Sequence, residues 1–597
     1  MSKIRPPIKY VDRDFDSIKR SLVNHAKRYY PNTYRDFNQA SFGSLLLDSV
    51  AYVGDVLSFY LDYQANESFL NTAIEKRNLI ELAKLYGYKH SESIAAFGFC
   101  DFFVTVPVNP LTSGPDLRYA PVLREGSSLN SSSGASYFLI EDVNFANPEN
   151  LIVVSGVDPV TGAPDSYAIK ATGQIKSGFI EESLHEIGDF KRFPKIKVPG
   201  ANITEVLSVE DSEGRRYYEV EHLSQDVIFV NLINRRESKH SVGSILKPKA
   251  VPRRFIADIV PGSVEIQFGQ ASDSEILSGS YEDPSSVVLK QYGKQHVSDM
   301  YLDPTKFTTT DKMGVAPSNT SLSVKVIRNE LQSANAPAGT VTQVSNPITL
   351  FDDESSLISS QVSSVISSIE CFNEEPVLGN LQTPSEEEIR LRTKSIYASQ
   401  NRAVTNADYT SMIYSMPSKF GSIARARVEH DTDSLKRNIN IYVISVDSQG
   451  KLIKTNMPIK NNLKTWLLNY RMMSDTFDIL DAHVVNIGID YEIIVHERFN
   501  KLETTVECNR EIQQYFATKS DIGQPLYLND IYNVLNNLES VVDVTNVSVR
   551  NLVGGTYSSL SYNIDLNLSL DERVLSIPGD HIYELKFPDT DIRGTTL

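Results

Sequence analysis

The chain is 597 residues long, about four times the length of a typical single domain, so several domains in series are expected. Apolar residues make up 41% of it and charged residues 22%, which is ordinary globular usage and argues against a disordered chain. The formal net charge of -17 argues against a general nucleic-acid binder, because phosphate binding requires clustered Lys and Arg.

The N-terminus has no secretory leader pattern and no charge-free run reaches membrane-spanning length, so neither export nor a membrane span is expected. Cys100, Cys371 and Cys508 lie far apart and form no C-x-x-C pair, which indicates a reducing compartment. The basic pairs Arg235-Arg236 and Arg253-Arg254 are interpreted as solvated or inter-subunit residues.

The first predicted helix, residues 15–26, has apolar side chains at helical spacing and ends before Pro31. The second, residues 42–69, carries three rows that repeat every seven residues. Two of the rows are apolar, and these are the candidate interface residues: Leu45, Tyr52 and Phe59, and Leu46, Val53 and Tyr60. A helix that is apolar on more than one side contacts more than one neighbour, which predicts a bundle built within this chain or completed by other chains.

The third row, Asp48, Asp55 and Asp62, is interpreted as a solvated or interface face, because carboxylates a heptad apart cannot share a metal ion. A third helix is predicted to begin at a capping box formed by Thr72 and Glu75 and to end at Gly87.

At about residue 96 the apolar period changes from helical to strand-like, and a β-rich region with recurring turn signals continues to about residue 370. Such spacing predicts small β-sandwiches or barrels, with residues 357–369 as a short helix or linker. Mixed α and β patterns follow, with helices over 386–397 and 406–415 and a strand over 439–443. The final part predicts a β-α-α-β unit, in which the strand at 485–495 buries one face.

The predicted fold class is therefore α+β multidomain, with an N-terminal helical bundle segment, central β-rich domains and C-terminal α+β domains. The predicted boundaries are 1–95 for the helical segment, 96–370 for a β-rich region of two subdomains, 371–480 for a first α+β domain and 481–597 for a second.

No nucleotide-binding, serine-hydrolase or zinc-protease motif is present, and no histidine has a second histidine at helical ligand spacing. Asp12, Asp14 and Asp16 begin like a calcium loop but lack its glycine and final glutamate, so they are interpreted as a helix N-terminus. Glu386-Glu387-Glu388 is explained by capping after Ser385. No catalytic, metal or cofactor-binding residue is predicted, and no cofactor.

Three residues before and in the helix at 406–415 are predicted to have a structural role. Asp408 is placed to cap with Thr405, and Arg402 is placed to bind nearby carbonyls or a carboxylate. On that interpretation, Arg402→Ala would leave a buried partner unpaired.

Several short strings occur in an order typical of one family. In the N-terminal part they are Gly43-Ser44-Leu45-Leu46-Leu47-Asp48, Ala65-Asn66-Glu67-Ser68-Phe69-Leu70-Asn71-Thr72-Ala73 and Leu85-Tyr86-Gly87-Tyr88. In the remainder they are Arg124-Glu125-Gly126-Ser127, Gln267-Phe268-Gly269, Arg390-Leu391-Arg392, Asn401-Arg402-Ala403-Val404-Thr405-Asn406-Ala407-Asp408-Tyr409 and Phe587-Pro588-Asp589-Thr590-Asp591-Ile592-Arg593-Gly594. The chain resembles the baseplate J-like family, and within it the wedge subunits of T-even-type contractile-tailed bacteriophages.

The resemblance implies a non-enzymatic virion protein, assembled in the bacterial host cytoplasm, with no nucleic-acid partner and no membrane span. Its N-terminal helices would join a bundle with another baseplate wedge protein. Its C-terminal domain would form a homodimer contact between two copies per wedge, linking wedges into a ring near the tail tube and sheath. That ring would rearrange when the sheath contracts.

An alternative from another class is a tail-associated glycan hydrolase or receptor-binding β-protein. The long β-rich region and the 29 Tyr and 25 Phe residues motivate it. Aromatic residues at these numbers are more often core and interface residues.

Overall fold

The structure, a computed structural model, describes residues 14–30, 38, 41–91, 93–109, 114–157, 163–233, 244–260, 262–271, 313–329, 334–381, 384–431, 438–517 and 521–596. It contains two compact units, Met1–Lys89 with Pro384–Tyr397, and His90–Thr383 with Ala398–Leu597. The predicted fold class is confirmed: helices come first, sheets dominate the middle, and mixed α and β structure follows. The predicted pair Arg235-Arg236 lies outside the described residues.

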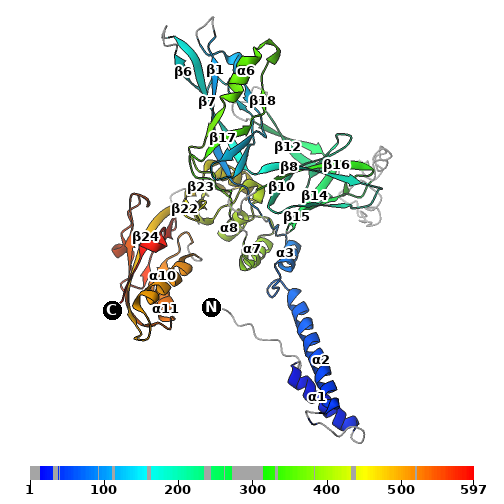
Figure 1. The fold of residues 1–597 in the computed structure, drawn as a ribbon, viewed down its shortest axis with the longest axis vertical. Helices are drawn as coiled ribbons and strands as arrows, with labels where there is room; N and C mark the ends of the chain where they lie inside the picture. Colours follow the sequence, from blue (N-terminus) through cyan, green and yellow to red (C-terminus); the bar gives the residue numbers. More distant parts are fainter. Residues whose placement is uncertain are drawn as a thin grey trace, which may run out of the picture. The chain divides into compact units, whose positions relative to one another are not determined.

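The helices of the first unit are α1 (Phe15–Tyr29), α2 (Phe42–Glu67), α3 (Lys76–Leu85) and α7 (Glu386–Ser399). Asp14 is the N-cap residue of α1 and Asp16 lies in its first turn, where carboxylates oppose the helix dipole favourably, as predicted; Asp12 lies outside the described residues. Figure 1 shows α1 lying along α2. Ser41 caps α2 by accepting a hydrogen bond from the amide of Ser44.

The capping box predicted from Thr72 and Glu75 is wrong. Helix α3 begins at Lys76 with Glu75 as N-cap residue, and no side chain of that pair caps it. Glu67, at the end of α2, instead binds the segment that leads into α3: its Oε1 accepts from the amide of Ile74 at 2.8 Å, and its Oε2 accepts from Asn78 Nδ2 at 2.9 Å. The predicted helix end at Gly87 is confirmed, since Gly87 has a φ of 90°.

Helices α3 and α7 are more than 300 residues apart in sequence yet share one small core. Its buried members are Leu79, Ile80, Ala83, Tyr88, Ile389 and Ile396. Arg390 of α7 donates from Nη2 to the carbonyl of Ala73 at 2.6 Å and from Nε to that of Leu70 at 3.2 Å. The apolar core and the arginine together fix α7 against the segment that joins α2 to α3.

The second unit begins with a sheet in the order β17-β3-β4-β7-β1-β19, with β6 pairing the outer part of β7. The strands are β1 (Phe97–Pro107), β3 (Ser128–Ser131), β4 (Ser136–Leu139), β6 (Leu151–Val157), β7 (Pro164–Ser177), β17 (Val341–Asn346) and β19 (Glu370–Phe372). The ends β17 and β19 lie in contact, so the sheet curls around its core. Three short strands, β2 (Val122–Leu123), β5 (Val143–Asn144) and β18 (Thr349–Leu350), and helix α6 (Ser359–Ser367) accompany it.

A second seven-stranded sheet is inserted between β7 and β17 in the chain, in the order β8-β16-β10-β11-β14-β15-β9. Its strands are β8 (Phe179–Ile187), β9 (Lys195–Pro199), β10 (Ile203–Asp211), β11 (Arg216–Glu219), β14 (Arg254–Val260), β15 (Ser263–Phe268) and β16 (Thr320–Arg328). A hairpin of β12 (Val227–Ile233) and β13 (Ser244–Ala250) adjoins it (Figure 1).

The interpretation of Arg254 as a solvated or inter-subunit residue is wrong. Its side chain is 1% exposed, and it donates from Nε to the carbonyl of Leu223 at 2.6 Å and from Nη1 to that of Val251 at 2.9 Å. A buried guanidinium with carbonyl acceptors holds the loops on either side of β12 and β13.

The third sheet contains β20 (Arg425–His430), β21 (Asn438–Val446), β22 (Leu452–Ile453) and β23 (Thr476–Asp481). Helices α8 (Asn406–Tyr414) and α9 (Met457–Leu468), and the short turn η5 (Ser418–Phe420), accompany it. One side of α9 is apolar and faces the core, since Ile459, Leu463 and Leu467 are fully buried.

The last sheet places β24 (His483–Val495) between β26 (Val541–Asn551), which is antiparallel to it, and β28 (His581–Glu584) and β29 (Ile592–Thr596), which are parallel to it. Helices α10 (Lys501–Ala517) and α11 (Leu528–Asn536) pack on it. Its remaining elements are β25 (Leu526–Tyr527), β27 (Val574–Leu575), α12 (Ile564–Asn567) and α13 (Pro588–Asp591). The predicted one-sided burial is confirmed, because Val485, Ile487, Ile489, Tyr491 and Ile493 are at most 1% exposed.

Candidate assembly surfaces

Helix α1 covers one side of α2. Ala51 is fully buried there, and a Cβ added at Gly54 would stand 3.3 Å from Ile18 Cδ1, so glycine permits the close approach. Lys19 of α1 forms an ion pair with Asp48 of α2, with 2.7 Å between Nζ and Oδ1. Asp48 therefore faces α1 and is not exposed to solvent alone.

Much of the remaining surface of α2 is apolar and exposed in the described part of the chain. The six interface candidates predicted from sequence, Leu45, Leu46, Tyr52, Val53, Phe59 and Tyr60, are each between 52% and 66% exposed. Further exposed apolar side chains of α2 are Phe42, Val50, Leu57 and Leu61. At 3.6 residues per turn these ten side chains cover roughly 200° of the circumference, more than a single neighbouring helix can bury.

By length and composition α2 is also able to cross a membrane, which differs from the expectation of no run of spanning length. Asp55 lies near its midpoint, and an aspartate at the centre of a spanning helix costs about 3 kcal/mol. A bundle of helices leaves Asp48 and Asp55 at its margin beside α1. The arrangement is thus better suited to a protein bundle than to a bilayer.

The motif before α8 differs in part from its prediction. Thr405 and Asp408 form the full capping box: Thr405 Oγ1 accepts from the amide of Asp408, and the Asp408 carboxylate accepts from the amide of Thr405. Arg402, however, is exposed, and its Nη2 lies 3.4 Å from Gln400 Oε1. The expected buried partner of Arg402 is wrong, since its hydrogen-bond partner in the described part of the chain, Gln400, is itself exposed.

The C-terminal sheet has an outer strand, β26, whose second edge pairs with no other strand among the described residues. Two aliphatic side chains on neighbouring strands are exposed close together there, Ile494 at 39% and Val542 at 58%. Asp490 and Arg550 form an ion pair on the same two strands. The surface formed by β24 and β26 therefore carries both charged and apolar side chains, with Ile494 and Val542 as a small apolar centre.

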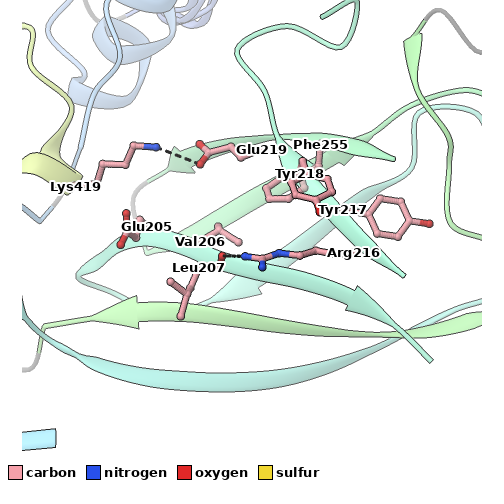
Figure 2. Close-up of a pocket in the computed structure, with 9 residues that line it drawn as sticks. All are labelled: Glu205, Val206, Leu207, Arg216, Tyr217, Tyr218, Glu219, Phe255 and Lys419. Atoms are coloured by element: carbon pink, nitrogen blue, oxygen red, sulfur yellow. Dashed lines mark hydrogen bonds and ion pairs between the residues drawn. The ribbon is translucent and has the colours of Figure 1, made fainter. Parts of the chain in front are cut away.

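A hollow of about 230 Å³ lies between the inserted sheet and turn η5. Figure 2 shows Lys419 directed at Glu219, with Glu205 close by and Tyr218 beside Glu219. The lining residues are Glu205, Val206, Leu207, Arg216, Tyr217, Tyr218, Glu219, Phe255 and Lys419. Both carboxylates in it are already paired with lysines, Glu205 with Lys176 at 2.5 Å and Glu219 with Lys419 at 3.5 Å.

Across the described ranges, no group of three or more His, Cys, Asp or Glu residues is arranged to hold a metal ion. Cys100, Cys371 and Cys508 are buried free thiols. Sequence reasoning missed the roles of Glu67 and Arg390, because each binds backbone groups that lie outside its own turn of helix.

Residues 14–85 match the family model described as bacteriophage baseplate protein, N-terminal domain. The chain matches no curated protein. Two solved structures align weakly with it. The alignment with a cryo-EM structure of the anti-feeding prophage baseplate covers 89% of this chain and 86% of the matched chain, at 9% sequence identity and a TM-score of 0.26. The alignment with the type VI secretion system TssK-TssF-TssG baseplate subcomplex covers 74% of this chain and 96% of the matched chain, at 9% sequence identity and a TM-score of 0.23.

The family match coincides with α1, α2 and α3, and therefore with the helix whose apolar surface is uncovered. It supports a structural role in a baseplate for this chain.

Proposed function

We propose that this chain is a non-catalytic wedge subunit of a contractile phage tail baseplate. The observation that carries the proposal is the coincidence of the baseplate family match with α2, which exposes roughly 200° of apolar circumference. Such a helix requires partners, and a multi-subunit baseplate provides them. Assembly would take place in the host cytoplasm, and the mature site would be the virion tail.

Within this proposal, residues 1–95 form a bundle with another wedge protein. The rows Leu45, Tyr52 and Phe59, and Leu46, Val53 and Tyr60, lie on different sides of α2 and would contact different helices. Burying a leucine, valine or aromatic side chain contributes about 1.5 to 3 kcal/mol, so the two rows suffice for a stable contact.

A second contact is proposed for residues 481–597, through which two copies of the chain per wedge would pair and link wedges into a ring near tail-tube and sheath-proximal proteins. The open edge of β26 and the exposed Ile494 and Val542 support it, because strand edges and apolar centres are typical of two-fold contacts. The ring would rearrange when the sheath contracts, as the resemblance to the wedge subunits implies.

The alternative of a glycan hydrolase receives no support from the hollow. A glycosidase requires two carboxyl groups directed at the scissile bond, whereas Glu205 and Glu219 are each engaged by a lysine, Lys176 and Lys419 respectively. Release of reducing sugars from host cell wall by the purified protein would favour the hydrolase over the wedge subunit.

The bundle is tested by placing charges on α2 without disturbing its own unit. Leu46→Glu and Val53→Glu alter side chains that are more than half exposed, so we expect an unchanged melting temperature. We also expect both variants to fail to co-purify with the other wedge proteins. Leu184→Glu, at a leucine that is 75% exposed on β8, is the matched control and should assemble normally. Normal wedges from both α2 variants would refute the proposed bundle.

The ring contact is tested separately with Ile494→Asp and Val542→Asp. Single wedges should form, because α2 is unchanged, but wedges should not close into rings in electron micrographs. Rings that close with both substitutions present would place the contact between wedges elsewhere in the chain.

A further inference from the structure

The inserted sheet, called here the inserted lobe (residues 179–328), is attached at a single place. The chain enters it at Gly178, directly after β7, and leaves it after Arg328 at the end of β16. Phe179 and Arg328 are register partners in the β8–β16 ladder, so the entry and exit points are neighbours. Gly178 has a φ of 119°, and a Cβ there would lie 2.7 Å from Ile327 Cγ2, so only glycine fits at the entry.

The inserted lobe and the sheet that carries it do not share a hydrophobic core. The core of the lobe is built from residues between Ile196 and Val326, and the core of the first sheet from residues between Ala96 and Ile175 and between Ala334 and Val377. No residue belongs to both. Inter-domain contacts without a shared apolar core permit relative motion of the domains.

Polar groups dominate the contact instead. Asn329, the first residue after the lobe, donates its backbone amide to the carbonyl of Asn202 in the lobe at 3.1 Å, close to the entry and exit points. Lys176 of β7, two residues before Gly178, pairs at the attachment itself with Glu205 of β10, which is the register partner of Ile327. Farther along the chain from the attachment, Lys419 of η5 pairs with Glu219 of β11. The hollow shown in Figure 2 lies beside these two pairs, so the contact there is incompletely packed.

The two pairs differ in burial. The side chains of Lys176 and Glu205 are 7% and 17% exposed, and their atoms Nζ and Oε1 are 2.5 Å apart. Burial lowers the pKa of Lys176, and the Glu205 carboxylate opposes that shift. Lys419 and Glu219 are 36% and 41% exposed at 3.5 Å, so water and salt screen that pair.

We propose that the inserted lobe pivots about Gly178 and is held against the rest of the unit by the pairs Lys176–Glu205 and Lys419–Glu219. A buried ion pair adds little net stability. Removing one of its two residues is nevertheless strongly destabilising, because the remaining charge is then buried without either a partner or water. Rotation of the lobe would hydrate that charge. While Lys176 is present, the closed position therefore depends on the Glu205 carboxylate as its partner, and the inference does not depend on the proposed wedge role.

The test measures the distance between the lobe and the rest of the unit in the full chain. Leu184→Cys on the lobe and Met473→Cys outside it introduce exposed thiols for spin labels, since the native cysteines are buried. We expect a single narrow distance distribution without further change. With Glu205→Gln added, we expect a broad distribution. With Lys176→Met added to Glu205→Gln, the narrow distribution should return, because no buried charge remains.

Glu265→Gln is the matched control, since Glu265 pairs with Lys195 inside the lobe at 3.9 Å and its loss should leave the distribution narrow. Should Glu205→Gln prevent folding, the exposed pair supplies the test: Lys419→Ala should broaden the distribution partly. A narrow distribution in Glu205→Gln, or in Lys419→Ala when the first variant does not fold, overturns the proposal. A distribution that stays broad after Lys176→Met also overturns it.

Discussion

Glu67 illustrates how one side chain organises the turn between two helices. It is 8% exposed and accepts hydrogen bonds from Asn78 Nδ2 and the amide of Ile74. These donors hold the pKa of Glu67 below the usual glutamate range. A carboxyl group with a lowered pKa in the folded state stabilises that state above its unfolded pKa and ceases to do so as the pH falls through the folded value.

We therefore expect Glu67→Gln to accelerate hydrogen exchange at the amide of Ile74 at neutral pH. The difference from the unmodified protein should begin to shrink below the ordinary glutamate pKa of about 4.3 and should vanish only as the pH falls through the lowered pKa of Glu67, where the folded protein binds the proton. A difference that stays constant from pH 7 to pH 3 would show that the charge of Glu67 is not what stabilises the turn.

The capping box of α8 gives a second expectation at the residue scale. Thr405→Ala removes a cap side chain and should lower the free energy of unfolding by about 1 kcal/mol. Arg402→Ala, at an exposed residue, should change it by less than about 0.5 kcal/mol. Urea unfolding of the two variants compares them directly, and a larger loss for Arg402 would contradict the observed exposure.

Among the elements, strand β6 is the most unusual. Leu151, Ile152, Val153, Val154 and Val157 are all at least 37% exposed, and the strand has no charged residue. The outer strand β9, by contrast, carries the charged residues Lys195 and Lys197. Charged residues on an edge strand oppose pairing with other chains.

We expect Val153→Lys to raise the solubility of the isolated protein, because a lysine on this edge opposes pairing between chains. Light scattering as the concentration rises measures the effect. Val324→Lys, at a fully buried valine of β16, is the contrasting change and should unfold the lobe. Equal scattering by the unmodified protein and Val153→Lys would show that the edge of β6 does not associate.

The elements also show what periodicity can and cannot predict. The helix at 42–67 and the strand at 483–495 were predictable because each repeats its apolar residues over several turns or pleats. The parallel strands β28 and β29 were not, since each is at most five residues long and pairs with β24 across about 100 residues of sequence. The capping box of α8 was predictable from four consecutive residues, whereas the hydrogen bonds of Glu67 to the segment before α3 depend on the chain reversing direction after α2.

At the scale of the whole molecule, α7 belongs with helices that precede it by three hundred residues. No local pattern reveals this, because the packing of Ile389 and Ile396 against α3 is set by tertiary contacts alone. The six interface candidates on α2 were identifiable from sequence for the opposite reason: their spacing fixes their side of the helix in any context.

Removing residues 1–90 should therefore affect α7 as well as the N-terminal helices. Loss of Leu79, Ile80 and Ala83 exposes Ile389 and Ile396, so we expect faster hydrogen exchange throughout α7. Strand β24, which lies in a separate core, should retain its protection. Unchanged protection in α7 would indicate that the helix is held by other contacts.

The adjacency of Phe179 and Arg328 has a consequence for the history and the engineering of the chain. Register partners on antiparallel strands have Cα atoms only about 5 Å apart, so a two-residue turn can join them. The lobe can thus be excised, or exchanged for an unrelated module, at a small cost in loop-closure entropy. Lys176, buried in the complete protein, would then reach water and need no partner. The lobe is thus an inserted domain that the rest of the chain can carry, lose or exchange.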